Sequence, residues 1–169
     1  YRELNELDSA IQSYEKAIVI NANYVEAHYS LGLTFQDLGQ LEKTVISYKK
    51  VLTIKPEFAG MHNNLGNVYR DLNELDAAVK YYEKAIAIKP DFVEVYYNLG
   101  ITFQELGQLD AAINSYEGAI AIKSDYAEAH NNLGDAFKEL GKVDEAVESH
   151  KNAINCKPDY AEAHNNLGD

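Results

Sequence analysis

The feature that most constrains this chain is a Leu-Gly dipeptide that returns at a fixed interval of 34 residues. Self-similarity at a period of roughly 20 to 50 residues is the signature of repeat proteins, in which each unit packs on its neighbours. The dipeptides are Leu31-Gly32, Leu65-Gly66, Leu99-Gly100, Leu133-Gly134 and Leu167-Gly168. With this leucine at position 7, full repeats run over 25–58, 59–92, 93–126 and 127–160, with a partial unit at 1–24 and the start of another at 161–169.

The apolar residues within each unit follow the period of an α-helix. Positions 4, 7, 8 and 11 share one helical face, and position 11 is aromatic in every full repeat. A second stripe at positions 17, 20, 21, 24, 27 and 28 reads Leu75, Ala78, Val79, Tyr82, Ala85 and Ile86 in one repeat. The pattern predicts two amphipathic helices per repeat and an all-α fold.

Residues that end or start helices separate the two stripes. Position 15 holds the two residue types that tolerate a left-handed backbone at the end of a helix, namely Asn5, Gly39, Asn73, Gly107 and Gly141. Proline follows the second stripe at Pro56, Pro90 and Pro158. Three aspartates, Asp91, Asp125 and Asp159, stand three residues before Glu94, Glu128 and Glu162. This spacing predicts a capping box at the start of each following helix.

The repeat resembles the tetratricopeptide repeat (TPR) over the whole chain. The matching residues in 59–92 are Leu65, Gly66, Tyr69, Ala78, Tyr82, Ala85 and Pro90. This resemblance implies one continuous right-handed superhelical solenoid of antiparallel helix hairpins. It also implies that the first helix of each hairpin lines a concave groove, and that positions 2, 5, 6, 9, 12 and 13 of that helix face the groove.

Both partial units predict open ends. Tyr1 falls at position 11 of its repeat and Asp169 at position 9 of the last one. Repeat arrays need polar terminal units, because each unit buries its faces only against its neighbours. We therefore expect a segment of a longer solenoid whose ends associate with one another.

The charge balance restricts the class of partner. A formal net charge of −12 and a pI of about 4.8 disfavour contact with phosphate backbones and anionic lipids. The sequence therefore predicts no nucleic-acid and no membrane partner. The one cysteine, Cys156, stands where other repeats have isoleucine, which predicts a small buried apolar side chain. In the absence of any targeting signal, a cytoplasmic location is the default expectation.

The histidines do not predict a metal site. His28, His62, His130 and His164 all occupy position 4, where a ring packs within the hairpin. Equivalent positions of successive repeats lie at least about 8–10 Å apart, whereas each zinc ligand lies roughly 2 Å from the metal. His150 replaces tyrosine at position 24 and is expected in the core. We expect no metal, no cofactor and no catalytic residue, so the chain is not predicted to be an enzyme.

Position 6 of the first helix is asparagine in most repeats: Asn64, Asn98, Asn132 and Asn166, with Ser30 in the remaining one. Asparagine is unfavourable inside helices, so a run of them calls for a compensating role. One interpretation is that these amides pair with the main chain of a bound peptide, since an amide both donates and accepts. The other is that each asparagine bonds within its own hairpin.

A narrower resemblance supports the first interpretation. The strings at 63–69 (Asn-Asn-Leu-Gly-Asn-Val-Tyr) and 89–92 (Lys-Pro-Asp-Phe) are similar to repeats in the superhelix of O-linked N-acetylglucosamine transferases. That resemblance implies that Asn64, Asn98, Asn132 and Asn166 form a ladder that grips the backbone of extended peptides. Ser30 breaks this ladder at one end.

The other groove positions alternate between two kinds of repeat. Repeats 25–58 and 93–126 supply aromatic and apolar side chains, whereas 59–92 and 127–160 supply amides and charges. Position 13 is acidic in every full repeat (Asp37, Asp71, Glu105 and Glu139), so the predicted groove is net acidic. The candidate partner-binding residues are Tyr29, Asn63, Asn64, Asn67, Arg70, Tyr97, Asn98, Ile101, Asn131, Asn132, Asp135, Lys138 and Asn166.

These features predict a protein-interaction module that binds an extended, basic or neutral peptide in its groove. The cations with which some TPR grooves bind C-terminal carboxylates are absent from positions 2, 5 and 6. Two alternatives stay open at this point. One is a substrate-recruiting arm of a larger transferase, and the other is a scaffold that assembles through its uncapped ends.

Overall fold

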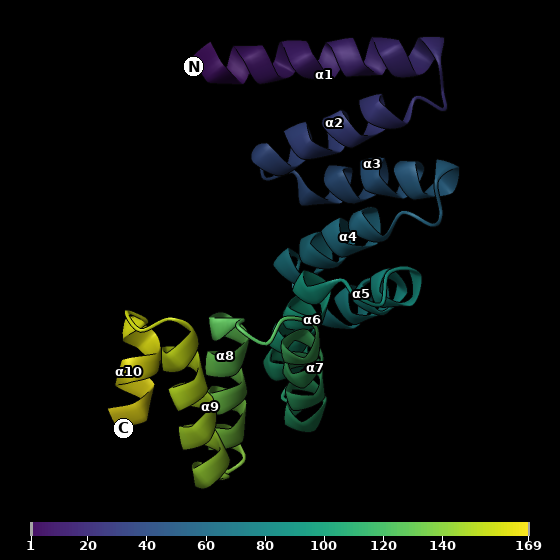
Figure 1. The fold of residues 1–169 in the computed structure, drawn as a ribbon. Coiled ribbons are helices and arrows are strands. Elements are labelled where there is room, and N and C mark those ends of the chain that lie inside the picture. Colours follow the sequence, from purple (N-terminus) through teal and green to yellow (C-terminus); the bar gives the residue numbers. More distant parts are fainter. Residues whose placement is uncertain (1, 169) are drawn as a thin grey trace. The chain divides into compact units, whose positions relative to one another are not determined.

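The computed structural model describes residues 2–168, with side chains from Glu6 onward, and every element in it is an α-helix (Figure 1). The helices fall into two compact units, residues 1–88 and 89–169, which are described separately. The all-α prediction is confirmed. No helix among the described residues is long and apolar enough to cross a membrane.

Unit 1 contains two helix hairpins and one further helix. Helix α2 packs against α3 and α4 packs against α5, while α1 packs on α2 and α3 on α4. Turns of only a few residues join consecutive helices, so each hairpin is antiparallel (Figure 1). The helices are α1 (Arg2–Ile20), α2 (Val25–Asp37), α3 (Leu41–Ile54), α4 (Ala59–Asp71) and α5 (Leu75–Ile88).

Unit 2 repeats this arrangement. Helix α6 packs against α7 and α8 against α9, with α7 on α8 and α10 on α9. The first helices also contact one another directly, α6 with α8 and α8 with α10. A core of Ala112, Ile113, Tyr116, Leu133 and Ala136 lies between α7 and α8. The helices are α6 (Val93–Glu105), α7 (Leu109–Ile122), α8 (Ala127–Glu139), α9 (Val143–Cys156) and α10 (Ala161–Gly168).

A glycine at position 8 lets the two helices of a hairpin approach closely. A Cβ atom added at Gly66 would lie 2.4 Å from Cε1 of Tyr82, and one at Gly134 would lie 2.5 Å from Cε1 of His150. Such distances are far shorter than a van der Waals contact, so no larger residue fits unless the ring moves. Position 8 therefore holds the ring at position 24 against the first helix.

The predicted left-handed turns are confirmed at four positions and wrong at one. Gly39, Asn73, Gly107 and Gly141 have φ angles of 68°, 59°, 69° and 73° and lie between the two helices of a hairpin. At Asn5, by contrast, helix α1 continues without interruption from Arg2 to Ile20. A left-handed residue would break the backbone hydrogen bonds of this helix, so Asn5 takes the right-handed helical conformation instead.

The capping boxes predicted at Asp91 and Asp125 are wrong. The N-cap residues of α6 and α8 are Phe92 and Tyr126, one position after the aspartates, and neither helix start has a side-chain cap hydrogen bond. These aromatic rings instead receive the ammonium group of a lysine three residues earlier, at 4.8 Å for Lys89 and 5.1 Å for Lys123. The local spacing of acidic residues did not reveal that an aromatic residue occupies the cap.

Position 4 histidines hold the turn that precedes their own helix. Nε2 of His28, His62 and His130 lies 2.9, 2.8 and 3.0 Å from the carbonyl oxygens of Ala22, Pro56 and Ser124. All three rings are buried. Position 4 therefore serves packing and turn geometry, as the sequence predicts. Cys156, however, is half-buried rather than buried.

Candidate peptide-binding surface

All thirteen candidate residues lie on first helices. In unit 1 they are Tyr29 on α2 and Asn63, Asn64, Asn67 and Arg70 on α4. In unit 2 they are Tyr97, Asn98 and Ile101 on α6, Asn131, Asn132, Asp135 and Lys138 on α8, and Asn166 on α10. The division into two units means that each group is considered by itself.

The unit 1 candidates are engaged with their own hairpins. The ring of Tyr29 stacks on Tyr48 with centroids 5.9 Å apart. Asn63 is buried, with 5% of its surface exposed. The hydroxyl of Tyr82 donates a 2.6 Å hydrogen bond to Oδ1 of Asn67. These contacts fix the side chains at positions 5 and 9 of the first helices.

Two asparagines at position 6 of unit 2, Asn132 and Asn166, bond to the preceding repeat. Nδ2 of Asn132 donates to the hydroxyl of Tyr97 at 3.2 Å. Nδ2 of Asn166 donates to Oδ1 of Asn131 at 3.2 Å and to Oδ1 of Asp135 at 3.0 Å. In both cases the acceptor is on the first helix of the preceding repeat. The amides at position 6 thus join successive first helices into one polar surface.

A pocket of about 360 Å³ opens on this surface. We call it the α6–α8 pocket. Its lining residues are Ile101, Gln104, Glu105, Tyr116, Asn132, Asp135 and Glu139. Three of the candidate residues, Ile101, Asn132 and Asp135, therefore meet in one place, whereas the exposed side chain of Lys138 does not line the pocket.

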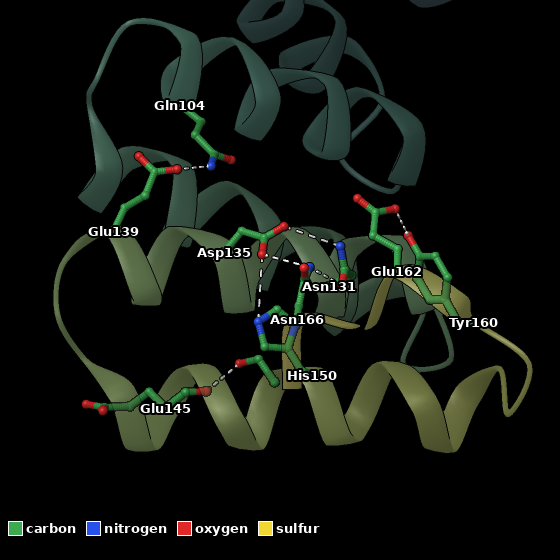
Figure 2. A network of polar contacts seen from close by, with 10 residues as sticks. Gln104, Asn131, Asp135, Glu139, Glu145, His150, Tyr160, Glu162 and Asn166 are labelled. Atoms are coloured by element: carbon green, nitrogen blue, oxygen red, sulfur yellow. Dashed lines mark hydrogen bonds and ion pairs between the residues drawn. The ribbon is translucent and has the colours of Figure 1, made fainter. Parts of the chain in front are cut away.

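A chain of hydrogen bonds fixes one side of the pocket. The hydroxyl of Tyr116 donates to Oε1 of Gln104 at 3.0 Å. In turn, Nε2 of Gln104 donates to Glu139 (Figure 2). Burial raises the pKa of Tyr116, so its hydroxyl stays protonated and acts as the donor. The carboxylate of Glu139 on α8 is in this way held against α6.

Asp135 lies in the centre of a second group of contacts. Asn131 donates to its Oδ2 at 3.3 Å and Asn166 to its Oδ1 at 3.0 Å (Figure 2). Burial, followed by repulsion from Glu162 and Glu139, raises the pKa of Asp135 to about 6, although Lys138 acts in the opposite direction. The carboxyl group is partly buried, so its charge is costly near neutral pH.

The buried ring of His150 lies next to Asp135. Its ring is 1% exposed, and Nε2 lies 3.7 Å from Oδ1 of Asp135, too far for a hydrogen bond. Neither ring nitrogen has a hydrogen-bond partner among the described residues. Burial, and then the nearby charge of Lys138, lowers the pKa of His150, so the imidazole is neutral at neutral pH.

Sequence reasoning missed the contribution of position 24 to this surface. The apolar stripe predicts only packing for position 24, which Tyr116 occupies, and His150 at the same position is expected to be buried, which the structure confirms. One signal in the sequence pointed further. Among the four full repeats, the one with histidine at position 24 is also the one with an acidic residue, Asp135, at position 9. In the structure these two residues face each other.

The described part of the chain contains no group of three or more His, Cys, Asp or Glu side chains placed to hold a metal ion. Burial, together with the nearby Asp125, raises the pKa of Cys156. This thiol is therefore protonated near neutral pH and is a poor nucleophile.

The hairpins, the glycine at position 8 and the polar surface of the first helices define a class, the helical-hairpin repeat proteins. The TPR repeat family matches residues 1–39, 66–107, 103–141 and 134–169, and a second tetratricopeptide repeat description matches 25–58. The chain belongs to the tetratricopeptide repeat family. Members of this family are protein-interaction modules, in general without catalytic activity, and this chain is such a module.

Solved structures agree with this assignment. A crystal structure of MamA is 31% identical, with a TM-score of 0.86, and the match covers 95% of this chain and 94% of that one. YrrB, described as a TPR protein with an unusual peptide-binding site, is 22% identical, with a TM-score of 0.83 and coverage of 97% and 84%. No curated protein matches the sequence.

One similar structure contains a bound peptide. The first TPR of Spaghetti (RPAP3) bound to the HSP90 peptide SRMEEVD is 24% identical, with a TM-score of 0.63. The match covers 65% of this chain and 87% of that one. At this identity the likeness shows the fold alone.

Proposed function

We propose that the chain binds an extended peptide segment of a partner protein across the first helices of unit 2, and that it catalyses no reaction. The observation that carries this proposal is the α6–α8 pocket, where predicted groove residues from two successive repeats converge. A pocket of this size suits one long side chain. The rest of the segment would then lie along the polar surface on either side.

The asparagines supply the contacts for a peptide main chain. Asn132 donates one N–H to the hydroxyl of Tyr97, and this bond fixes the orientation of the Asn132 amide. An asparagine amide has a second N–H and an oxygen with two lone pairs, so it can still bond to a peptide. Asn98 lies at the same position one repeat earlier. A pair of oriented amides in successive repeats fits the repeating donors and acceptors of an extended chain.

The charge of the surface selects the partner. Glu105, Asp135 and Glu139 line the pocket, and the whole chain has a formal net charge of −12. An acidic surface attracts basic segments and repels nucleic acids and anionic lipids. We therefore propose a basic or neutral partner segment, and neither nucleic acid nor membrane as a ligand.

The experiment that tests this function is a peptide-array screen of the purified chain. The test variant is N98A/N132A, and the matched control is N114A/N152A, which removes two asparagines from the second helices α7 and α9. The proposal is supported if peptides bind the parent chain and the control but do not bind the test variant. Far-UV circular dichroism must show that the helicity of the test variant is unchanged. Absence of binding by any peptide, or equal binding by both variants, contradicts it.

A second candidate function is self-association through α1. Val19 and Ile20 on this helix are each 86% exposed, an unusual exposure for two adjacent large apolar residues. If this face joins two copies, sedimentation should show a concentration-dependent dimer that the substitution V19S/I20S abolishes. A chain that stays monomeric at high concentration would exclude this role.

A further inference from the structure

The α6–α8 pocket combines apolar walls with concentrated negative charge. Ile101 contributes an aliphatic surface and Tyr116 the edge of a buried ring, whereas Glu105, Asp135 and Glu139 contribute three carboxylates. None of the lining residues is basic. A ligand that fills this pocket must therefore present an apolar stem and a group that tolerates, or requires, several carboxylates.

Two of the carboxylates are held in place before any ligand arrives. Gln104 donates to Glu139, while Asn131 and Asn166 donate to Asp135 (Figure 2). Each donor is itself neutral, so the hydrogen bonds orient the carboxylates without neutralising them. Preoriented groups lose little conformational freedom on binding, and this favours a ligand that can bond to both.

Among the described residues, only Lys138 has a charge that favours the ionised form of Asp135. Burial and the carboxylates of Glu162 and Glu139 raise its pKa to about 6, and the opposing effect of exposed Lys138 does not cancel them. A cation from outside the chain would relieve this repulsion. The cost of burying the carboxylate is then offset only when the pocket is occupied.

His150 is a second, independent indication of a missing ligand. This buried ring faces Asp135, yet neither of its nitrogens has a hydrogen-bond partner. A neutral imidazole offers one donor and one acceptor, and leaving both unused in the interior costs free energy. His150 does not itself line the pocket, so its unused nitrogens indicate that polar pairing is incomplete around Asp135, which does line it.

We propose that the α6–α8 pocket is a specificity site for one lysine or arginine side chain of the bound peptide. The aliphatic stem would lie along Ile101, with the cationic group between Asp135 and Glu139. This inference rests on the proposed function, since the side chain belongs to the peptide that unit 2 binds. It goes further in naming the residue type that the ligand must carry and the two carboxylates that select it.

The test uses the full chain and a host peptide chosen from those that bind on the array, with a single variable position in the pocket. The guests at that position are arginine, lysine, citrulline and norleucine. Citrulline has the shape of arginine without the charge, and norleucine keeps the apolar stem of lysine. Fluorescence anisotropy measures each dissociation constant for the parent chain, for D135N/E139Q and for the control E117Q/E148Q. The control removes two exposed carboxylates from α7 and α9.

The expected result is that arginine or lysine binds about tenfold more tightly than citrulline or norleucine, a difference typical of one well-placed charge pair. This preference should disappear in D135N/E139Q and persist in E117Q/E148Q. The stronger of the two cationic guests identifies the side chain. If peptides bind but do not discriminate citrulline from arginine, the inference is wrong while the proposed function stands. A preference that survives in D135N/E139Q also overturns the inference, and failure of every peptide to bind overturns both.

Discussion

The hairpin α4–α5 of unit 1 and the hairpin α8–α9 of unit 2 use the same frame for different chemistry. In both, a glycine at position 8 lets a buried ring at position 24 lie against the first helix. In α4–α5 the ring is Tyr82, and its hydroxyl bonds to Asn67 at 2.6 Å. In α8–α9 the ring is His150, and it faces Asp135 at 3.7 Å without a hydrogen bond.

This difference indicates that the polar pair in α8–α9 is less stabilising than the pair in α4–α5. The pair Tyr82–Asn67 is satisfied within its hairpin, whereas the pair His150–Asp135 combines an unpartnered imidazole with a carboxylate of raised pKa. Unfavourable polar groups in a well-packed frame are typical of sites that are completed by a ligand. The repeat frame therefore supplies packing, and we propose that the residues at positions 9 and 24 determine which hairpin contributes carboxylates to a binding site.

The largest effect on stability is expected when the tyrosine at position 24 of α4–α5 is replaced by the histidine found at that position in α8–α9. We expect Tyr82→His to lower the free energy of unfolding by about 2–3 kcal/mol, since it removes a buried hydrogen bond and leaves a cavity. Urea denaturation followed by circular dichroism measures the change. Tyr82→Phe, which removes only the hydroxyl, should cost about 1 kcal/mol. Equal costs for the two variants would show that the smaller ring leaves no cavity.

The reverse exchange should be stabilising and smaller. In His150→Tyr the hydroxyl can donate to Asp135, as Tyr82 donates to Asn67, and we expect a gain of about 1 kcal/mol in the free energy of unfolding. The same denaturation experiment applies. His150→Phe separates the contribution of ring volume from that of the hydrogen bond, because phenylalanine supplies a six-membered ring without a hydroxyl donor. A gain of the same size in His150→Phe would assign the effect to packing and not to Asp135.

The smallest expected effect comes from Asp135→Asn, and it depends on pH. The folded-state pKa of Asp135 is raised to about 6, from an ordinary value near 3.9. Below about pH 3 the carboxyl group is protonated in both states and contributes no difference. As the pH rises to 6 the unfolded state loses its proton first, so the parent chain loses stability over that range and does not recover it above.

Asp135→Asn should therefore be more stable than the parent chain by up to about 1 kcal/mol at pH 7, with only a small part of this advantage left near pH 4. This magnitude allows for the half-exposed position of the carboxyl group and for the one acceptor that an amide takes away from Asn131 or Asn166. Melting temperatures measured between pH 4 and 8 test the prediction. A lower melting temperature for the variant at pH 7 would show that these two amide donors outweigh the cost of burying the charge.

The sequence by itself determined the repeat, the two helices per unit and the turns between them. These features follow from local rules. Apolar residues at helical spacing define the stripes, and only glycine or asparagine tolerates the positive φ found at Gly39, Asn73, Gly107 and Gly141. The rules failed where tertiary context competes with local preference. Aromatic residues took the N-cap positions predicted for aspartate, and α1 continued through Asn5.

The tertiary structure decided how the candidate residues meet. Period and spacing placed Ile101, Asn132 and Asp135 on the same face of successive first helices. They could not show that Tyr116 and Gln104 complete a pocket with them, or that Asn166 bonds to Asp135 of the preceding repeat. Contacts of this kind depend on the separation and tilt of packed helices. The 34-residue period encodes neither, because it describes each helix only along its own axis.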